Sequence, residues 1–134
     1  MAATCPTVWI TSDAFPVEAG EDEATNPGVY GKAFAHWIAG QLRALGHDAG
    51  EPFAEDWGWC VPLGGHDFPM WVACANEHGS EATWGAYAVA EPGLVRRLFF
   101  RPDTAGPLAH VGQALRQTMT HAPGLQRLWI EDMP

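Results

Sequence analysis

Hydrophobic residues alternate with polar residues, or run together, in five short segments that are typical of β-strands. The segments are residues 7–12 (TVWITS), 52–61 (PFAEDWGWCV), 68–75 (FPMWVACA), 83–90 (TWGAYAVA) and 125–131 (LQRLWIE). β-Branched and aromatic residues are frequent in them, and clusters of Gly, Pro, Asn or Asp separate them. Segment 68–75 is apolar on both faces, so we expect it to lie in the middle of a sheet.

Two other segments have apolar residues at helical spacing. The first opens at Thr25 or Asn26, has Pro27 in its first turn and ends at Gly46. Its apolar stripe consists of Tyr30, Phe34, Trp37, Ile38, Leu42 and Leu45, of which Tyr30, Phe34, Ile38 and Leu42 should be largely buried. The second covers residues 107–121, with Leu108, Val111, Leu115 and Met119 on one face.

The order of these elements, β-α-β-β-β-α-β, predicts an α+β fold. We expect a two-layer sandwich, with a mostly antiparallel sheet and two helices on one face. Residues 94–101 fit either a short helix or an edge strand. The length of 134 residues, with no linker or repeat, predicts a single domain spanning residues 1–134.

The composition of the chain indicates the cellular compartment in which we expect the protein. The chain has no apolar run of about 18 residues that would cross a membrane, and its first residues lack the basic start and apolar centre of a signal peptide. Cys5, Cys60 and Cys74 are odd in number and have no CxxC spacing, so we interpret them as reduced thiols. These observations predict a cytoplasmic protein, and six Arg against one Lys, with many Ala and Gly, suggest a bacterial source.

The charge is negative and unevenly distributed. The net charge is −9, and residues 1–91 contain 13 Asp and Glu against 2 Lys and Arg. A field of this sign repels nucleic acids and anionic membranes and attracts basic proteins. We therefore expect a protein partner with a basic surface, and neither nucleic acid nor membrane.

The acidic residues concentrate in segment 13–24, which contains no Lys or Arg. They are Asp13, Glu18, Glu21, Asp22 and Glu23. A long loop in a compact domain is uncommon unless it is functional or disordered, so this segment is either a recognition surface or a solvated loop. Phe15 within it would either anchor a partner or return to the core. If the charges are exposed, neutralising Glu21, Asp22 and Glu23 should leave stability nearly unchanged.

A second candidate is the sequence Glu55-Asp56-Trp57-Gly58-Trp59. In one continuous strand, Phe53, Glu55, Trp57, Trp59 and Val61 would share a face, and Ala54, Asp56, Gly58 and Cys60 the other. Adjacent carboxylates on opposite faces do not form an acid/base pair. Either one carboxylate braces nearby backbone while both Trp side chains fill the core, or the aromatic residues and carboxylates grip an Arg or Lys of a partner.

The remaining candidate residues do not form a recognisable metal-binding or phosphate-binding pattern. His66 and Asp67 lie in a turn between the strands that contain Cys60 and Cys74, but no close ligand pair such as CxxC or HxxxH is present. We therefore expect no metal and no cofactor. Arg96, Arg97 and Arg101 form a basic cluster without a glycine-rich phosphate loop, so we interpret it as a counterweight to the acidic half.

Size and acidity together resemble those of bacterial immunity proteins, which neutralise a toxin, and of secretion chaperones. We expect a non-enzymatic inhibitor or immunity protein that binds a toxin or effector with a basic surface through the acidic loop, Trp57 and Trp59. One alternative is a small enzyme or ligand-binding domain that uses Glu55, Asp56 or His66 in an aromatic-lined pocket. Another is a secretion chaperone or an acidic mimic of nucleic acid.

Overall fold

The computed structural model describes residues 2–93 and 102–132. The strands are β1 (Ala3–Thr4), β2 (Thr7–Ser12), β3 (Phe53–Glu55), β4 (Gly58–Leu63), β5 (Met70–Asn76), β6 (Thr83–Ala90) and β7 (Leu125–Glu131). The helices are the short 3-10 helix η1 (Glu21–Glu23) and the α-helices α1 (Lys32–Ala44) and α3 (Ala105–Thr120). The predicted segment 94–101 lies outside the described residues.

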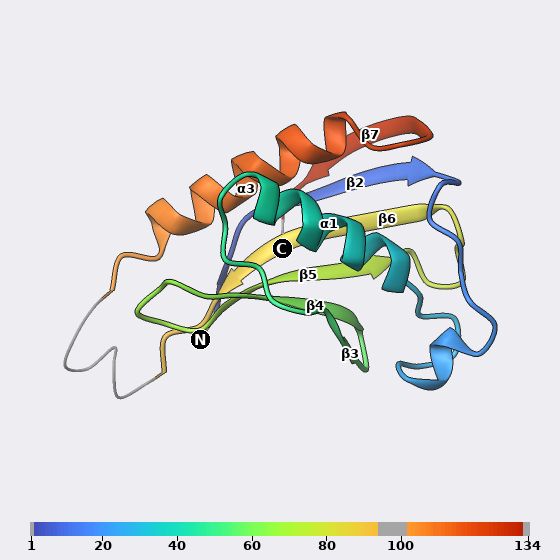
Figure 1. The fold of residues 1–134 in the computed structure, drawn as a ribbon, viewed down its shortest axis with the longest axis horizontal. Helices are drawn as coiled ribbons and strands as arrows, with labels where there is room; N and C mark the ends of the chain where they lie inside the picture. Colours follow the sequence, from blue (N-terminus) through green and yellow to red (C-terminus); the bar gives the residue numbers. More distant parts are fainter. Residues whose placement is uncertain (1, 94–101, 133–134) are drawn as a thin grey trace.

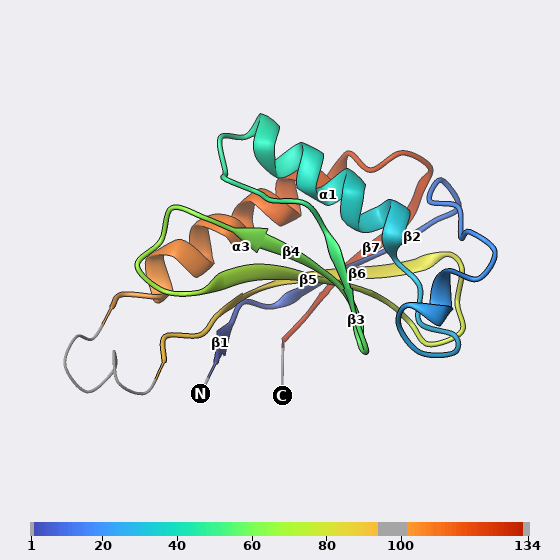
Figure 2. The ribbon, with the colours of Figure 1, turned by 60° about the horizontal axis from the view of Figure 1, so that its bottom comes forward.

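All strands join one antiparallel sheet. Its order is β3-β4-β5-β6-β2-β7, and β1 also pairs with β6. Both α-helices lie on the same face of this sheet (Figures 1 and 2). The predicted α+β sandwich with a mostly antiparallel sheet is therefore confirmed, and the expected central position of segment 68–75 is confirmed by β5, which pairs with β4 and β6.

The core fills the space between the sheet and the two helices. On α1, Phe34, Ile38 and Leu42 are fully buried, as the helical spacing predicts. The predicted face of α3 is also buried, through Leu108, Val111, Leu115 and Met119. Because antiparallel partners point to the same side, every second residue of each strand faces this layer, and its neighbours face the uncovered side of the sheet.

The predicted start of the first helix is wrong. Thr25 and Asn26 do not open a helix; the Asn26 carbonyl accepts the Val29 N–H at 2.9 Å, and the Thr25 hydroxyl donates to the Val29 carbonyl at 2.6 Å. Because of this hydrogen-bonded turn, α1 begins only at Lys32. Tyr30 therefore precedes the helix and is only half-buried.

The predicted continuous strand 52–61 is also wrong, because the chain folds back within it. β3 and β4 pair as a hairpin whose connecting residues are Asp56 and Trp57. Gly58 follows with a φ of 151°, and a Cβ there would lie 2.6 Å from the Cys74 carbonyl oxygen of β5. Only glycine fits this combination of backbone angle and close approach. Phe53 consequently pairs with Cys60 and does not share a face with Trp59.

Candidate functional site

Three connections meet at one end of the molecule, on the right in Figure 1. They are the acidic segment before α1, the β3–β4 turn and the β5–β6 turn. The Asn26 side chain donates to the Asp56 carbonyl at 3.0 Å, and His78 Nε2 lies 2.9 Å from the Pro27 carbonyl oxygen. These contacts place residues 26–27, which closely follow the acidic segment, beside the Glu55–Trp59 stretch and the β5–β6 turn.

Asn76, at the end of β5, makes three hydrogen bonds that hold these connections together. Its side-chain oxygen accepts the Tyr30 N–H at 3.1 Å, and its amide donates to the carbonyls of Gly28 at 3.0 Å and Ser80 at 2.8 Å. Asn76 is 8% exposed, so its polar atoms are used inside the protein. The residues between the acidic segment and α1 are consequently anchored to the sheet.

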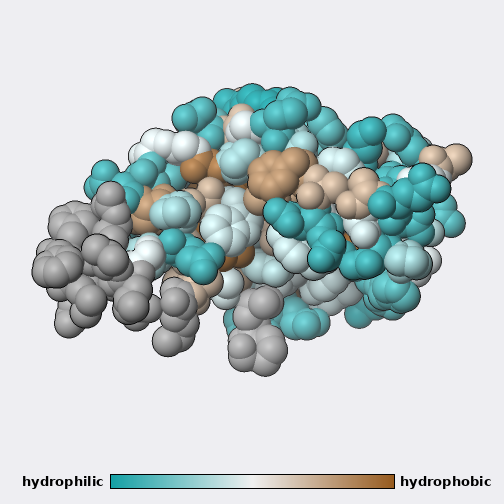
Figure 3. All heavy atoms as spheres, turned by 90° about the horizontal axis from the view of Figure 1, so that it is seen from below, coloured by the Kyte–Doolittle hydropathy of each residue, from teal (hydrophilic) through white to brown (hydrophobic). Residues whose placement is uncertain are grey.

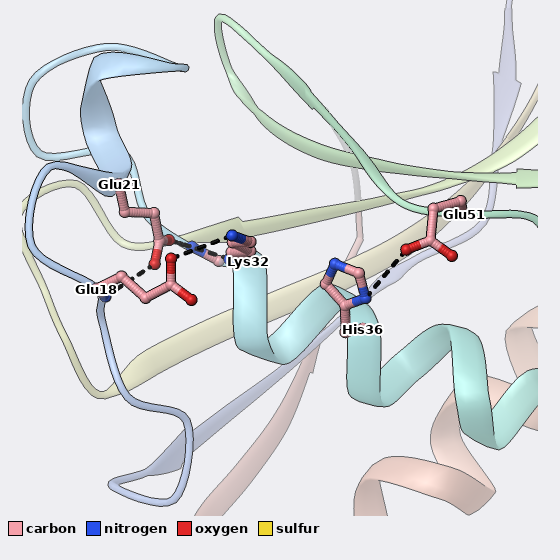
Figure 4. Close-up of polar contacts among 6 residues, drawn as sticks. Glu18, Glu21, Lys32, His36 and Glu51 are labelled. Atoms are coloured by element: carbon pink, nitrogen blue, oxygen red, sulfur yellow. Dashed lines mark hydrogen bonds and ion pairs between the residues drawn. The ribbon is translucent and has the colours of Figure 1, made fainter.

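We call the exposed carboxylates of this region the acidic end. They are Glu18, Glu23, Glu55, Asp56, Glu77 and Glu81. Lys32 partly offsets them, because its Nζ lies 3.1 Å from Glu18 Oε2 (Figure 4). In the view from below, this end of the molecule is mostly hydrophilic, while hydrophobic and intermediate residues form a band across the middle (Figure 3).

Trp57 is the aromatic residue exposed at the acidic end. It lies in the β3–β4 turn beside Glu55 and Asp56, and 44% of its surface is exposed. Glu55 and Asp56 are both exposed, so neither is the inward-facing carboxylate that a continuous strand would have placed in the core. The turn thus presents an exposed indole ring directly after two exposed carboxylates in the sequence.

Glu21 is not part of this exposed surface. It is 7% exposed, and its Oε2 accepts the N–H groups of Gly31 at 2.8 Å and Lys32 at 3.0 Å. Its Oε1 accepts the Glu18 N–H at 3.2 Å (Figure 4). A carboxylate at a helix N-terminus satisfies donors that have no partner within the helix. The premise that Glu21 is exposed is therefore wrong, and its neutralisation is expected to lower stability.

Asp22 also has an internal role. Its Oδ2 accepts the Gly28 N–H at 3.0 Å, which closes the loop between η1 and α1. Two of the carboxylates predicted to bind a partner thus hold the loop in shape. Glu23 is exposed, and so is Asp13 at the end of β2.

Phe15 returns to the core and cannot anchor a partner. It is 4% exposed and lies among three other aromatic rings, with centroid distances of 5.4 Å to Phe34, 5.2 Å to Trp37 and 6.3 Å to Trp84. The alternative that it packs back onto the fold is confirmed. This aromatic cluster holds the first half of the acidic segment against α1 and β6.

Trp59 is likewise a core residue and not a binding residue. It is 7% exposed and faces α1, with its ring centroid 6.4 Å from that of His36. Its Nε1 has no hydrogen-bond partner among the described residues. His36 itself lies 3.7 Å from Glu51 on the outer side of α1 (Figure 4).

The three cysteines are buried free thiols. Burial raises the pKa of Cys5 and Cys74, and burial together with the nearby Glu55 raises the pKa of Cys60 to about 11. Thiols of this kind are poor nucleophiles near neutral pH, because the thiolate is the reactive form. Their arrangement supports packing, and not cysteine catalysis.

No group of three or more His, Cys, Asp or Glu side chains in the described ranges is arranged to hold a metal ion. His66 stacks on Phe68, with ring centroids 5.6 Å apart. A hollow of about 260 Å³ lies between the C-terminal end of α1 and α3 and is lined by Leu45, His47, His110, Gln113, Ala114 and Gln117. Glu55, Asp56 and His66 do not line it, so it is not the aromatic pocket expected of the enzyme alternative.

One surface was missed by the sequence analysis. The face of the sheet opposite the helices carries the aromatic residues Phe53, Trp9, Trp71, Tyr87 and Trp129, all of them partly or well exposed. Trp9 and Trp129 stack, with ring centroids 6.2 Å apart, and the Arg127 guanidinium lies 4.6 Å from the centre of the Trp129 ring. The alternation within segments 7–12, 68–75, 83–90 and 125–131 indicated which residues share a face of the sheet. The sequence alone does not show which of the two faces the helices cover.

None of the helices in the part of the chain that the structure describes is long and apolar enough to span a membrane. Comparison with protein-family models, curated proteins and solved structures found no significant match. The functional argument consequently depends on the chemistry of the surfaces described above.

Proposed function

We propose that this chain is a non-enzymatic protein-binding domain, of the kind that inhibits a bacterial toxin or effector with a basic surface. The observation that carries the proposal is the hydrogen bond from Asn26, two residues after the acidic segment, to the Asp56 carbonyl in the turn that exposes Trp57. An exposed indole in the same turn as two exposed carboxylates is suited to an Arg- or Lys-rich surface. The carboxylates attract the cations, and the ring accepts a cation or an apolar stem on its face.

The two parts of this surface have different roles in binding. Carboxylates at the rim of an interface chiefly raise the association rate, and salt screens them over about 10 Å at 0.1 M ionic strength. A partly exposed aromatic residue that becomes fully buried chiefly slows dissociation. Charge and anchor are therefore separable by kinetics.

The test uses proteins encoded beside this gene, immobilised as candidate partners, with association and dissociation measured at low and high salt. The charge variant combines Glu23→Gln, Glu55→Gln and Asp56→Asn, three exposed carboxylates that accept no hydrogen bond within the described residues. Its matched control combines Asp48→Asn, Asp67→Asn and Glu91→Gln, which remove the same charge from exposed positions elsewhere.

The charge variant should associate about tenfold more slowly at low salt and nearly normally at high salt, because steering typically contributes at least this factor. Trp57→Ala should dissociate about tenfold faster or more, as expected of a buried aromatic anchor. If the control variant slows association as much as the charge variant does, the association rate depends on the net charge of the protein and not on the position of the carboxylates. Unchanged rates for both the charge variant and Trp57→Ala would refute the acidic end as the binding surface.

A further inference from the structure

β7 forms one edge of the sheet. Its inner side pairs with β2 over residues Thr7–Ser12, and no strand of the described ranges pairs with its outer side (Figure 1). The backbone N–H and C=O groups on that side are therefore open to another strand. Exposed edges of this length are normally guarded or used for association.

The side chains of β7 are arranged symmetrically about Trp129. Arg127 lies two residues before it and Glu131 two residues after it, on the uncovered face. Leu128 and Ile130 lie on either side of it, on the face of the helices. In an antiparallel pair centred on Trp129, each of these residues meets its complement in the second strand.

We propose that β7 pairs antiparallel with β7 of a second copy of this chain, with the two-fold axis at Trp129. Arg127 then lies opposite the second copy's Glu131 on both sides of the axis, and Leu128 opposite Ile130. Opposite charges directly across an antiparallel pair stabilise it, whereas like charges destabilise it. The interface is isologous, as a closed symmetric dimer requires.

The same arrangement covers apolar surface. Ile130 is 45% exposed and Leu128 is partly exposed, and each would cover the other across the axis. On the uncovered face, the stacked pair of Trp9 and Trp129 would meet its symmetry copy and form a row of four tryptophans. The two-fold axis is perpendicular to the sheet, so the helices of both copies remain on one side.

Only one register gives this charge pairing. Moving the second strand by two residues is the smallest shift that keeps side chains on their own faces. In one direction it places Arg127 opposite Trp129 and in the other Glu131 opposite Trp129, and both remove the Arg–Glu contact. A basic peptide would find one acidic side chain on the uncovered face of β7, Glu131, and one cation, Arg127. The charge pattern of this edge therefore matches a second copy better than it matches the basic partner of the acidic end.

The test measures molar mass by light scattering and sedimentation from low to high micromolar concentration. Arg127→Glu gives an edge with two acids, and Glu131→Arg gives an edge with two bases, so each variant alone should dimerise at least about tenfold more weakly. The double variant should regain the wild-type affinity. Glu91→Arg, the same charge reversal at an exposed site outside β7, should have little effect on self-association.

Mixing the two single variants gives the sharpest result. Every cross-strand pair in their heterodimer is again acid against base, so the mixture should associate although neither variant does alone. A wild-type chain that is monomeric at all concentrations would overturn the proposal and identify Arg127 and Glu131 as edge-protecting residues. A dimer that is insensitive to the single variants, or a mixture that fails to associate, would also overturn it. None of these variants alters Trp57, so the outcome is independent of the proposed function.

Discussion

Replacing Glu21 by Ala should destabilise the protein although Glu21 lies in an acidic, loop-like segment. Its carboxylate accepts three backbone N–H groups, from Glu18, Gly31 and Lys32, and the Gly31 contact is buried. At about 1 kcal/mol for each lost hydrogen bond, the free energy of unfolding should fall by about 3 kcal/mol. That is more than the loss of an ordinary N-cap, about 1 kcal/mol, because Glu21 also holds the preceding loop.

Glu21→Gln should lose about half as much. The amide keeps one oxygen acceptor but turns an N–H₂ group toward a backbone donor, so one side of the site is satisfied and the other is not. The matched control is Glu23→Gln, in the same 3-10 helix but exposed, which should change stability by less than about 0.5 kcal/mol.

Chemical denaturation followed by circular dichroism measures these differences. The capping role is supported if the free energy of unfolding is lowest for Glu21→Ala, intermediate for Glu21→Gln and highest for the wild type, with Glu23→Gln close to the wild type. If Glu21→Ala unfolds at the same denaturant concentration as Glu23→Gln, the carboxylate does not stabilise α1 and the reasoning fails.

Three further expectations follow from buried or perturbed groups. Trp59→Phe removes a buried indole N–H that has no partner in the described part of the chain, and the loss of this unpaired donor should offset the cost of the smaller ring, so stability should change by less than about 1 kcal/mol. A loss above about 2 kcal/mol would contradict this balance. Folding raises the pKa of the Cys60 thiol from 9.0 to about 11, so the unfolded chain loses this proton at lower pH than the folded one. The free energy of unfolding should therefore be highest below pH 9 and fall between pH 9 and 11. In Cys60→Ala it should fall less between these two pH values. Burial and then the charges of His110 and His66 lower the pKa of His47 below 6.5, so stability from neutral His47 is present above this value and is lost on acidification. His110→Gln should raise that pKa in an NMR titration, and an unchanged midpoint would contradict the coupling.

The sequence predicted best the elements with long, regular periodicity. The bounds of β2, β6 and β7 agree with the predicted segments, and α3 differs by one or two residues at each end. In these segments the local pattern and the tertiary packing require the same conformation. The fold class followed from their order.

The start of α1 could not be found in this way. The sequence Thr25-Asn26-Pro27-Gly28 is both a helix-entry signal and a turn signal, and the turn is formed. The residue that caps the helix, Glu21, is ten positions before Gly31. A cap supplied from outside the local sequence leaves no mark in the periodicity.

The β3–β4 hairpin was missed for a similar reason. Asp56 and Trp57 are not a common hairpin pair such as Asn-Gly, and alternation continues through them as if the strand were straight. The feature that requires Gly58 is the Cys74 carbonyl of a neighbouring strand. Both parts of the candidate site were visible in the sequence, but their junction and the burial of Glu21, Phe15 and Trp59 depend on these tertiary contacts.

The position of β2 in the sheet has a consequence for the folding order. The neighbours of this strand are β6 and β7, from the second half and the end of the described chain, whereas β3, β4, β5 and β6 are joined by short connections. Closing a short loop costs less entropy than closing a long one, so the meander can assemble first. β2 then has to insert beside β6 after most of the polypeptide exists, and such high contact order predicts slow folding.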